Sequence, residues 1–216
     1  PPMAEEALTP RLASVLGAPA DAATRTLTGS TRAGAQALAG ALDAGPWGRP
    51  AEQADSIGLV VVADCPRGAP DSEIEHPAGA GATAVVLAPD GAGTVVDRAA
   101  HVESAPGSRF RGAGDAETTG LGITQYDREA FTTALGGAAD SLDADLSGVD
   151  AAAVQSPDGK LPYRAAGALG VDTETIAAGE TVSHLGDTGA ASAFLGAAST
   201  FDDGAERVLL AAYGSG

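Results

Sequence analysis

The sequence predicts an α/β fold in which helices cover both faces of a sheet. Two unbroken runs of small and β-branched residues, IGLVVVA at 57–63 and ATAVVLA at 82–88, are typical of strands buried on both faces. Strand-like and helix-like segments then alternate through the second half of the chain. Apolar residues make up 44% of the chain but aromatic residues only 4%. The core is therefore built mainly from Ala, Gly and Val, which favours layers packed backbone close to backbone.

Each element is expected from its local pattern. Segments rich in Ala and Leu predict helices, β-branched or alternating segments predict strands, and glycine clusters predict loops. In chain order, we expect helices at 3–16 (interrupted by Pro10) and 30–42 (capped by Ser30, stopped by Gly45-Pro46), strands at 57–63, 82–88 (ended by the turn Pro89-Asp90-Gly91) and 94–103 (antiparallel to its neighbour), a loop at 109–124, a helix at 127–142, a strand at 149–154, helices at 161–169 and 188–199, and a strand at 207–213.

Acidic residues strongly outnumber basic ones. In 216 residues, 29 Asp and Glu against 12 Lys and Arg give a net charge of −17, and Lys160 is the only lysine. Nucleic acids and anionic membranes would repel such a chain, so the charge disfavours both and neither is expected as a partner. Dense carboxylates, scarce lysine and an Ala/Gly-rich core are typical of a halophilic, salt-adapted proteome. An ordinary acidic cytoplasmic protein is the alternative.

Cysteine usage and hydropathy indicate the compartment. A single cysteine, Cys65, cannot form an internal disulfide, which fits a reducing environment. No apolar run approaches the ~18 residues of a membrane span, and residues 1–10 lack the basic and apolar regions of a signal peptide. We therefore expect a cytoplasmic protein.

Two short patterns resemble ligand motifs but lack their context. The GxGxxA spacing at 79–84 precedes a strand, whereas dinucleotide-binding glycines follow one, so close packing explains it better. His76, His101 and His184 are far apart and have no metal-binding spacing, so no metal site is expected.

Other candidates remain open. Cys65 follows a predicted buried strand and is either a reactive thiol or a packed small residue. Arg109 and Arg111 lie in a glycine-rich loop, where they either clamp a phosphate or balance the acidic surface.

The second half carries three consecutive segments with ligand-binding character. The strand at 149–154 runs into the polar turn QSPDGK at 155–160. The segment LGDTGAAS at 185–192 opens a helix with glycines and small residues, and such an N-terminus presents free N–H groups to an oxyanion or a thioester carbonyl. The strand RVLLAAYGSG at 207–216 ends in glycines that let a ligand approach the backbone.

In this order and spacing, these segments resemble the C-terminal half of archaeal-type hydroxymethylglutaryl-CoA (HMG-CoA) synthases of the thiolase superfamily. The stretch 57–87 is similar to the family's central strand pair, and the resemblance covers about half of the chain. It implies a thiolase-like α/β/α/β/α fold, with a shortened N-terminal half at 1–104 and a C-terminal half at 105–216. It also implies acyl-CoA as a ligand, with no covalently bound cofactor, and a dimer formed through the central sheet.

The resemblance assigns roles to individual residues. The family's nucleophilic cysteine lies in a Cys-x-Ala-Gly segment that opens a helix, and Thr31 takes that place in TRAG here. The family's histidine position matches Gln155, and the family's glutamate has no match. A threonine hydroxyl needs an adjacent base to attack a thioester, and glutamine cannot shuttle protons. The residues expected to bind ligand are Lys160, Gly186, Asp187, Thr188, Gly189, Gly214 and Ser215.

Three functions follow as hypotheses. The first is a catalytically degenerate relative of HMG-CoA synthase that serves as an acyl-CoA-binding or scaffold subunit. The resemblance implies homo- or hetero-oligomers with thiolase-superfamily subunits and a Zn-ribbon/OB-fold protein. The second is an active acyltransferase with altered catalytic residues, and the third is an acidic α/β binding protein unrelated to CoA. Lys160 either meets a CoA phosphate or is an exposed turn residue.

Overall fold

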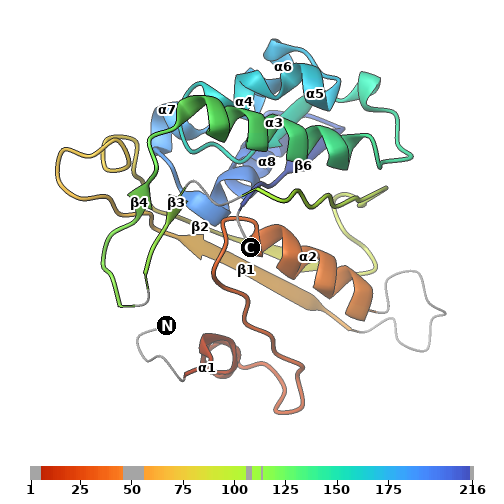
Figure 1. The fold of residues 1–216 in the computed structure, drawn as a ribbon. Coiled ribbons are helices and arrows are strands. Elements are labelled where there is room, and N and C mark those ends of the chain that lie inside the picture. The colour runs from red at the N-terminus through yellow and green to blue at the C-terminus, as the bar shows by residue number, and fades with distance from the viewer. Residues whose placement is uncertain (1–5, 46–55, 106–108, 113, 215–216) are drawn as a thin grey trace.

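The computed structural model describes residues 6–45, 56–105, 109–112 and 114–214. Four layers follow one another in this part of the chain (Figure 1). A sheet of β1 and β2 forms one side, and α2 and α8 form a central helical layer. A second sheet of β5 and β6 follows, and helices α3 to α6 cover its far face. None of the described helices is long and apolar enough to cross a membrane.

The first half contains the two strands expected there. The β1 and β2 strands pair in antiparallel fashion, with Val60 opposite Val85. The sequence predicted that both faces of these strands would be buried, and this is wrong for the described residues, because burial alternates along β1. Only one face is covered by helices. The elements of this half are α1 (Leu8–Val15), α2 (Ala33–Ala44), β1 (Gly58–Asp64) and β2 (Gly81–Leu87).

Helix boundaries differ from the prediction in this half. Pro10 lies in the first turn of α1 and does not interrupt it, because the missing N–H of proline costs nothing there. Ser30 is not the N-cap of α2; its Oγ accepts a bond from Arg32 N at 3.4 Å, before the helix begins. Met3 and Pro46, the expected start of the first helix and stop of the second, lie outside the described residues.

The predicted strand at 94–103 is wrong, because this segment forms no strand and joins no ladder. Side chains attach it instead. The Asp97 carboxylate accepts bonds from the Asp143 and Ala144 N–H groups, and Arg98 donates to the Ala39 carbonyl of α2. The valines of this segment, Val95, Val96 and Val102, are exposed.

The second half forms a parallel β–α–β unit. Strands β5 and β6 pair in parallel, and α8 lies in the connection between them and packs against both. The expected helix at 161–169 is split into α4 and α5, and the sequence missed α6, whose N-terminus is capped by Asp172. The elements are β3 (Arg109–Phe110), β4 (Thr119–Gly120), α3 (Thr124–Ala139), the 3-10 helix η2 (Leu146–Gly148), β5 (Ala151–Val154), α4 (Leu161–Arg164), α5 (Ala166–Leu169), α6 (Thr173–Ala178), α7 (Val182–Leu185), the 3-10 helix η3 (Gly189–Ala191), α8 (Ser192–Asp202) and β6 (Val208–Ala211).

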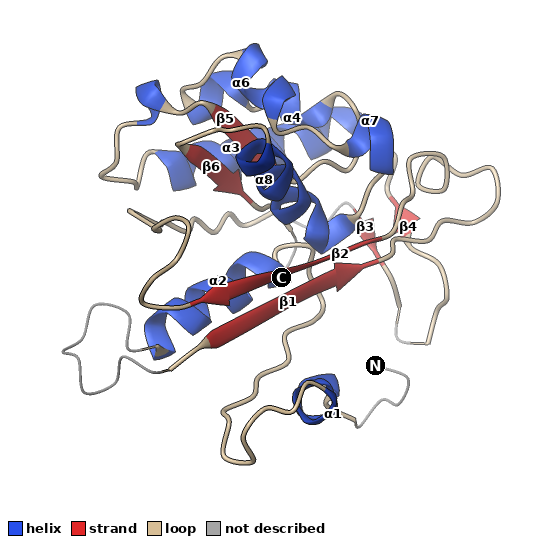
Figure 2. Cartoon of the chain, turned by 180° about the vertical axis from the view of Figure 1, so that it is seen from behind, coloured by secondary structure: helices blue, strands red, loops and turns tan. Residues whose placement is uncertain are grey.

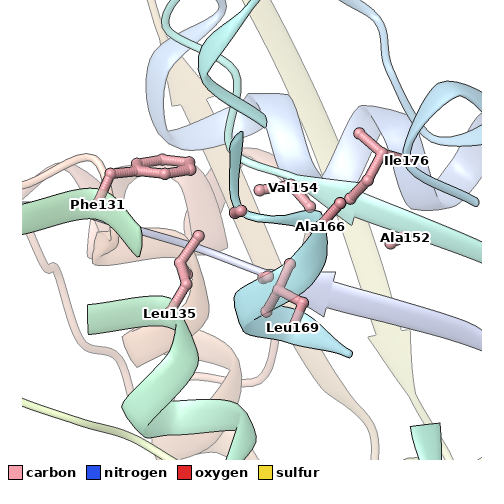
Figure 3. Close-up of a cluster of buried hydrophobic side chains, with 9 residues drawn as sticks. Phe131, Leu135, Ala152, Val154, Ala166, Leu169 and Ile176 are labelled. Carbon is pink, nitrogen blue, oxygen red and sulfur yellow. The ribbon is translucent and has the colours of Figure 1, made fainter. Parts of the chain in front are cut away.

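Two apolar clusters hold the layers together. One lies between the β5–β6 sheet and helices α3 to α6, where Phe131 and Leu135 of α3 pack toward Val154 and Leu169 (Figure 3). The other joins β1 to the central helices through Val60, Val62 and Phe194, and includes Leu210 of β6. The central helices therefore contact both sheets.

Small residues set the spacing of the central layer. A Cβ atom added at Gly34 of α2 would lie 2.7 Å from a Val62 methyl and 2.8 Å from the Phe194 ring. Both distances are shorter than a van der Waals contact, so α2 packs this closely only because residue 34 has no side chain. This agrees with the core of Ala, Gly and Val that the composition predicts.

Acid is expected to loosen the start of the β5–β6 sheet. Backbone N–H groups of Arg207 and Glu206 donate to Asp150 Oδ2 and lower the pKa of this carboxyl group. A lowered folded-state pKa means that the contribution to stability is present above the ordinary aspartate pKa and is lost as pH falls through the folded-state value. Asp150→Asn should therefore lower the urea concentration at the unfolding midpoint at pH 7. Between pH 5 and 2 this midpoint should decrease less in the variant than in wild type. Equal acid sensitivity in Asp150→Asn and wild type, measured by urea titration, would contradict this role.

Candidate ligand-binding site

The residues expected to act on a ligand gather at the carboxyl edge of the β5–β6 sheet. Parallel strands end at the same edge, and in α/β folds ligands bind in the crevice outside it. Gln155 follows β5, and its N–H donates to the carbonyl of Ala211, the last residue of β6, at 2.8 Å. Thr31, just before α2, donates its hydroxyl to the carbonyl of Tyr213 at 2.7 Å. The two positions, more than a hundred residues apart in sequence, are thus both fastened to the end of β6.

The contact between Thr31 and the end of β6 is close. A Cβ atom at Gly214 would lie 2.6 Å from Thr31 Oγ1 and 2.7 Å from Arg32 N, so only glycine fits there. Tyr213 stacks edge-on against Phe131 of α3, with ring centroids 5.0 Å apart, and burial raises the pKa of the Tyr213 phenol. The predicted ligand-binding residue Ser215 lies outside the described residues.

Gln155 and Ser156 connect the end of β5 to the start of α8. Gln155 is 3% exposed and Ser156 1% exposed. The Ser156 N–H donates to the hydroxyl of Ser192, the first residue of α8, at 2.8 Å. The N-terminus of α8 is therefore held at the same edge as Thr31 and Gln155, and its positive dipole end faces the same region.

Asp187 forms the most buried charged contact of the described chain. Its carboxylate accepts bonds from Arg109 of β3 at 3.0 Å and from the Gly189 N–H at 2.8 Å, and the residue is 3% exposed. Burial outweighs both partners and raises the pKa of Asp187, and the nearby Asp64 carboxylate adds to the increase.

Asp64, at the end of β1, belongs to the same cluster and was missed by the sequence analysis. Its Oδ2 accepts a bond from Ala190 N at 3.0 Å and its Oδ1 from Cys65 N at 2.8 Å. Two carboxylates, Asp187 and Asp64, thus occupy the N–H groups of Gly189 and Ala190. An aspartate directly after a strand was the available signal, but its partner lies over a hundred residues further on.

The other predicted ligand residues are Lys160, Gly186 and Thr188, and each has a different environment. Lys160 is exposed in a turn, where Asp158 Oδ1 accepts bonds from the N–H groups of Lys160 and Leu161. Gly186 adopts φ +73°, and a Cβ atom there would lie 2.6 Å from the Pro77 carbonyl oxygen. Thr188 is fully buried, and among the described residues its hydroxyl has no hydrogen-bond partner.

Exposure and pairing bear on the two alternatives that the sequence left open. Cys65 is exposed, so its interpretation as a packed small residue is wrong. Arg109 pairs with the buried Asp187, which is neither a phosphate contact nor a balance of the acidic surface, and Arg111 lies exposed on the surface. Within the described residues, no three His, Cys, Asp or Glu side chains lie close enough to hold a metal ion.

Solved structures with the same fold were found for this chain. The HMG synthase of the curacin biosynthetic pathway aligns with a TM-score of 0.78 at 17% identity, over 99% of this chain and 57% of its own. An HMG-CoA synthase complexed with CoA aligns with a TM-score of 0.75 at 17% identity, over 93% and 54%. The chain therefore has a thiolase-like layered α/β fold, of which the described residues form four layers, and it is shorter than the solved chains that share it.

The curated proteins that are similar in sequence to this chain are hydroxymethylglutaryl-CoA synthases. The hydroxymethylglutaryl-CoA synthase of Pyrobaculum neutrophilum is 30% identical over 165 residues, which are 74% of this chain and 47% of the relative. That of Archaeoglobus fulgidus is 29% identical over 164 residues, or 74% and 48%. No family model matches the chain. The chain is homologous to hydroxymethylglutaryl-CoA synthases, and it spans about half the length of the curated relatives it matches.

Proposed function

We propose that this chain is a catalytically degenerate, acyl-CoA-binding or scaffold relative of HMG-CoA synthase. The observation that carries the proposal is the hydrogen bond from the Thr31 hydroxyl to the Tyr213 carbonyl. A threonine nucleophile must pass its proton to a base as it attacks, and a peptide carbonyl is not basic enough to take it. The resemblance places Thr31 where the family has its nucleophilic cysteine.

Gln155 supports the same proposal. A general acid or base at this position must gain and lose a proton near neutral pH, which a glutamine amide does not do. The side chain lies buried at the end of β5, where the resemblance places the family's histidine. If both positions correspond to the family's catalytic residues, this edge lacks the nucleophile and the proton shuttle that acyl transfer requires.

Acyl-CoA is the proposed ligand because two of the solved neighbours are described as complexed with CoA and with 3-hydroxy-3-methylglutaryl coenzyme A. The starts of α2 and α8 are held at this edge through the hydroxyl groups of Thr31 and Ser192, and the positive end of a helix dipole stabilises a thioester oxygen. Lys160 is the proposed partner of a CoA phosphate.

The proposal is tested by restoring the missing groups. Wild type should bind acetyl-CoA in calorimetry but neither take up a labelled acetyl group nor condense acetyl-CoA with acetoacetyl-CoA. Thr31→Cys should gain a covalent acetyl label, because a thiolate at a helix N-terminus attacks thioesters without a strong base. Thr28→Cys, three residues upstream and exposed, is the matched control and should stay unlabelled.

Adding Gln155→His to Thr31→Cys tests the second position, and it should raise the rate at which the label is lost to water. Wild-type condensation that disappears in Thr31→Val would contradict degeneracy and favour the alternative, an active acyltransferase with altered residues. The observation that keeps this alternative is the hydroxyl that Thr31 retains beside the positive end of α2. Absence of acetyl-CoA binding would leave only the scaffold role.

The proposal also covers the partners of this chain and its cellular setting. Assembly with thiolase-superfamily subunits and a Zn-ribbon/OB-fold protein is proposed from the resemblance, and a halophilic, cytoplasmic setting from the net charge of −17. Folding that requires molar salt, followed by circular dichroism, would support the salt-adapted setting. Full stability at low ionic strength would contradict it.

A further inference from the structure

Within the described residues, two polar contacts fasten the β3–β4 hairpin to the rest of the fold. The Arg109 guanidinium of β3 pairs with the Asp187 carboxylate at 3.0 Å. Just before β4, the Thr118 N–H donates to the Arg67 carbonyl at 2.7 Å. The ladder of the hairpin joins only two residue pairs, and Figure 2 shows its strands beside the end of β1. So short a hairpin depends on contacts with the body for its position.

The hairpin forms one wall of a groove. This groove has a volume of about 350 Å³ and is lined by Ala116 and Glu117 of the hairpin and, on the opposite side, by Pro66, Arg67, Gly68, Glu75 and Ala78 of the loop after β1. The same loop is bonded to the segment of the buried carboxylate, because the Gly79 N–H donates to the Asp187 carbonyl at 2.9 Å. The Arg109–Asp187 pair therefore connects the two walls of the groove.

The ion pair is the contact whose strength depends on a proton. Asp187 is 3% exposed and the Arg109 side chain 33% exposed, so the cation reaches the carboxylate from the surface. Burial raises the pKa of Asp187, and the nearby Asp64 carboxylate adds to the increase, against the opposing bonds from Gly189 and Arg109. A neutral Asp187 no longer attracts the guanidinium, and it becomes neutral at a higher pH than an ordinary aspartate.

Other ionisable groups lie around the pair. The exposed ones are Cys65, Arg67, Asp71, Glu73, Glu75 and His76 of the loop after β1, His184 of α7, and Arg111, Asp115 and Glu117 of the hairpin. β2, η3 and the start of α8 contribute none. The charged groups that act on the pKa of Asp187 are Arg109 and Asp64. Protonation of Asp187 itself is therefore the event that changes the strength of this contact.

We propose that the Arg109–Asp187 pair is an acid-sensitive latch, which holds the hairpin against the groove while Asp187 is ionised and releases the hairpin when Asp187 is protonated. Gly122, with φ +67°, lies two residues after β4 and gives the chain a flexible point about which the hairpin moves. Release opens the groove and exposes Asp187 to solvent. The inference is independent of acyl-CoA binding.

Hydrogen exchange of the whole chain, followed by mass spectrometry, tests the latch. In wild type, protection of the amides at 117–122, corrected for intrinsic exchange rates, should fall at least about fivefold between pH 7 and 4, while β1 keeps its protection. Asp187→Asn should show low protection at both pH values, because the amide carries no charge to attract Arg109. Arg111→Met is the matched control and should behave as wild type, because Arg111 is exposed and makes no ion pair with a described residue.

Arg109→Met removes the cation instead of the carboxylate and should match Asp187→Asn, so it provides the same test if that variant does not fold. Three results would overturn the proposal. The first is wild-type protection at 117–122 that does not change between pH 7 and 4. The second is an acid-induced fall that persists in Asp187→Asn or Arg109→Met. The third is an equal fall in β1, which would assign the change to acid unfolding of the whole chain.

Discussion

Replacing Gly196 with alanine should lower the free energy of unfolding by about 2 kcal/mol. Gly196 lies in the middle of α8, where an added Cβ would collide with the Gly179 carbonyl and lie 3.1 Å from the Ala153 Cβ of β5. Helix α8 would have to move away from the β5–β6 sheet, which disturbs the central layer. The helix propensity gained from alanine, about 1 kcal/mol, offsets only part of this cost.

Gly167→Ala is the matched control for this experiment. Gly167 also lies in a helix, α5, but nothing lies within 4 Å of the position of its Cβ. That variant should be neutral or more stable by up to about 1 kcal/mol, since alanine restricts the unfolded chain. Urea denaturation of both variants measures the difference, and equal stabilities would mean that α8 does not pack on Gly179 as described.

Removing the Arg109 guanidinium is expected to cost about 2 kcal/mol at pH 7 in Arg109→Met. Breaking a fully buried ion pair costs about 3 to 5 kcal/mol, and the value is reduced here because the Arg109 side chain is 33% exposed. The methionine keeps the apolar stem but leaves the Asp187 carboxylate buried without a cation. The Gly189 N–H alone would then stabilise that charge.

The pH dependence of the loss identifies its cause. Burial raises the folded-state pKa of Asp187 above the ordinary aspartate value. The contribution of this residue to folding stability is therefore fully present below the ordinary pKa and is lost as pH rises through the folded-state pKa. Below that folded-state pKa the carboxyl group is neutral and needs no cation. The difference between wild type and Arg109→Met should therefore shrink on acidification from pH 7 to 4.

Asp187→Asn is the rescue variant for this pair. An asparagine keeps an oxygen that accepts from Gly189 N, but it removes the buried charge. The double variant with Arg109→Met should be more stable than Arg109→Met alone at pH 7. If Asp187→Asn adds further loss instead, the carboxylate itself is needed at the N-terminus of η3, and the burial argument is wrong.

The sequence placed the right segments at the candidate site but not all of its contacts. The turn at 155–160, the glycines at 186–189 and the end of the last strand follow from local patterns, and the structure brings the strand ends and the start of α2 together. The contribution of Asp64 could not be read from the sequence, because its partner Ala190 is set by the packing of β1 on the central layer. Arg109 was ambiguous for the same reason, since its role depends on the burial of a carboxylate far along the chain.

The sequence by itself determined the kind of layers this protein has. Unbroken β-branched runs, small-residue helices and the strand–turn–helix order of the second half follow from side-chain periodicity, which is a local property. Only the tertiary structure decided which faces those layers cover, because burial depends on what lies opposite. It therefore showed Leu59 and Val61 facing water, 94–103 held by side chains and not by a ladder, and the Thr31 hydroxyl bonded to the Tyr213 carbonyl.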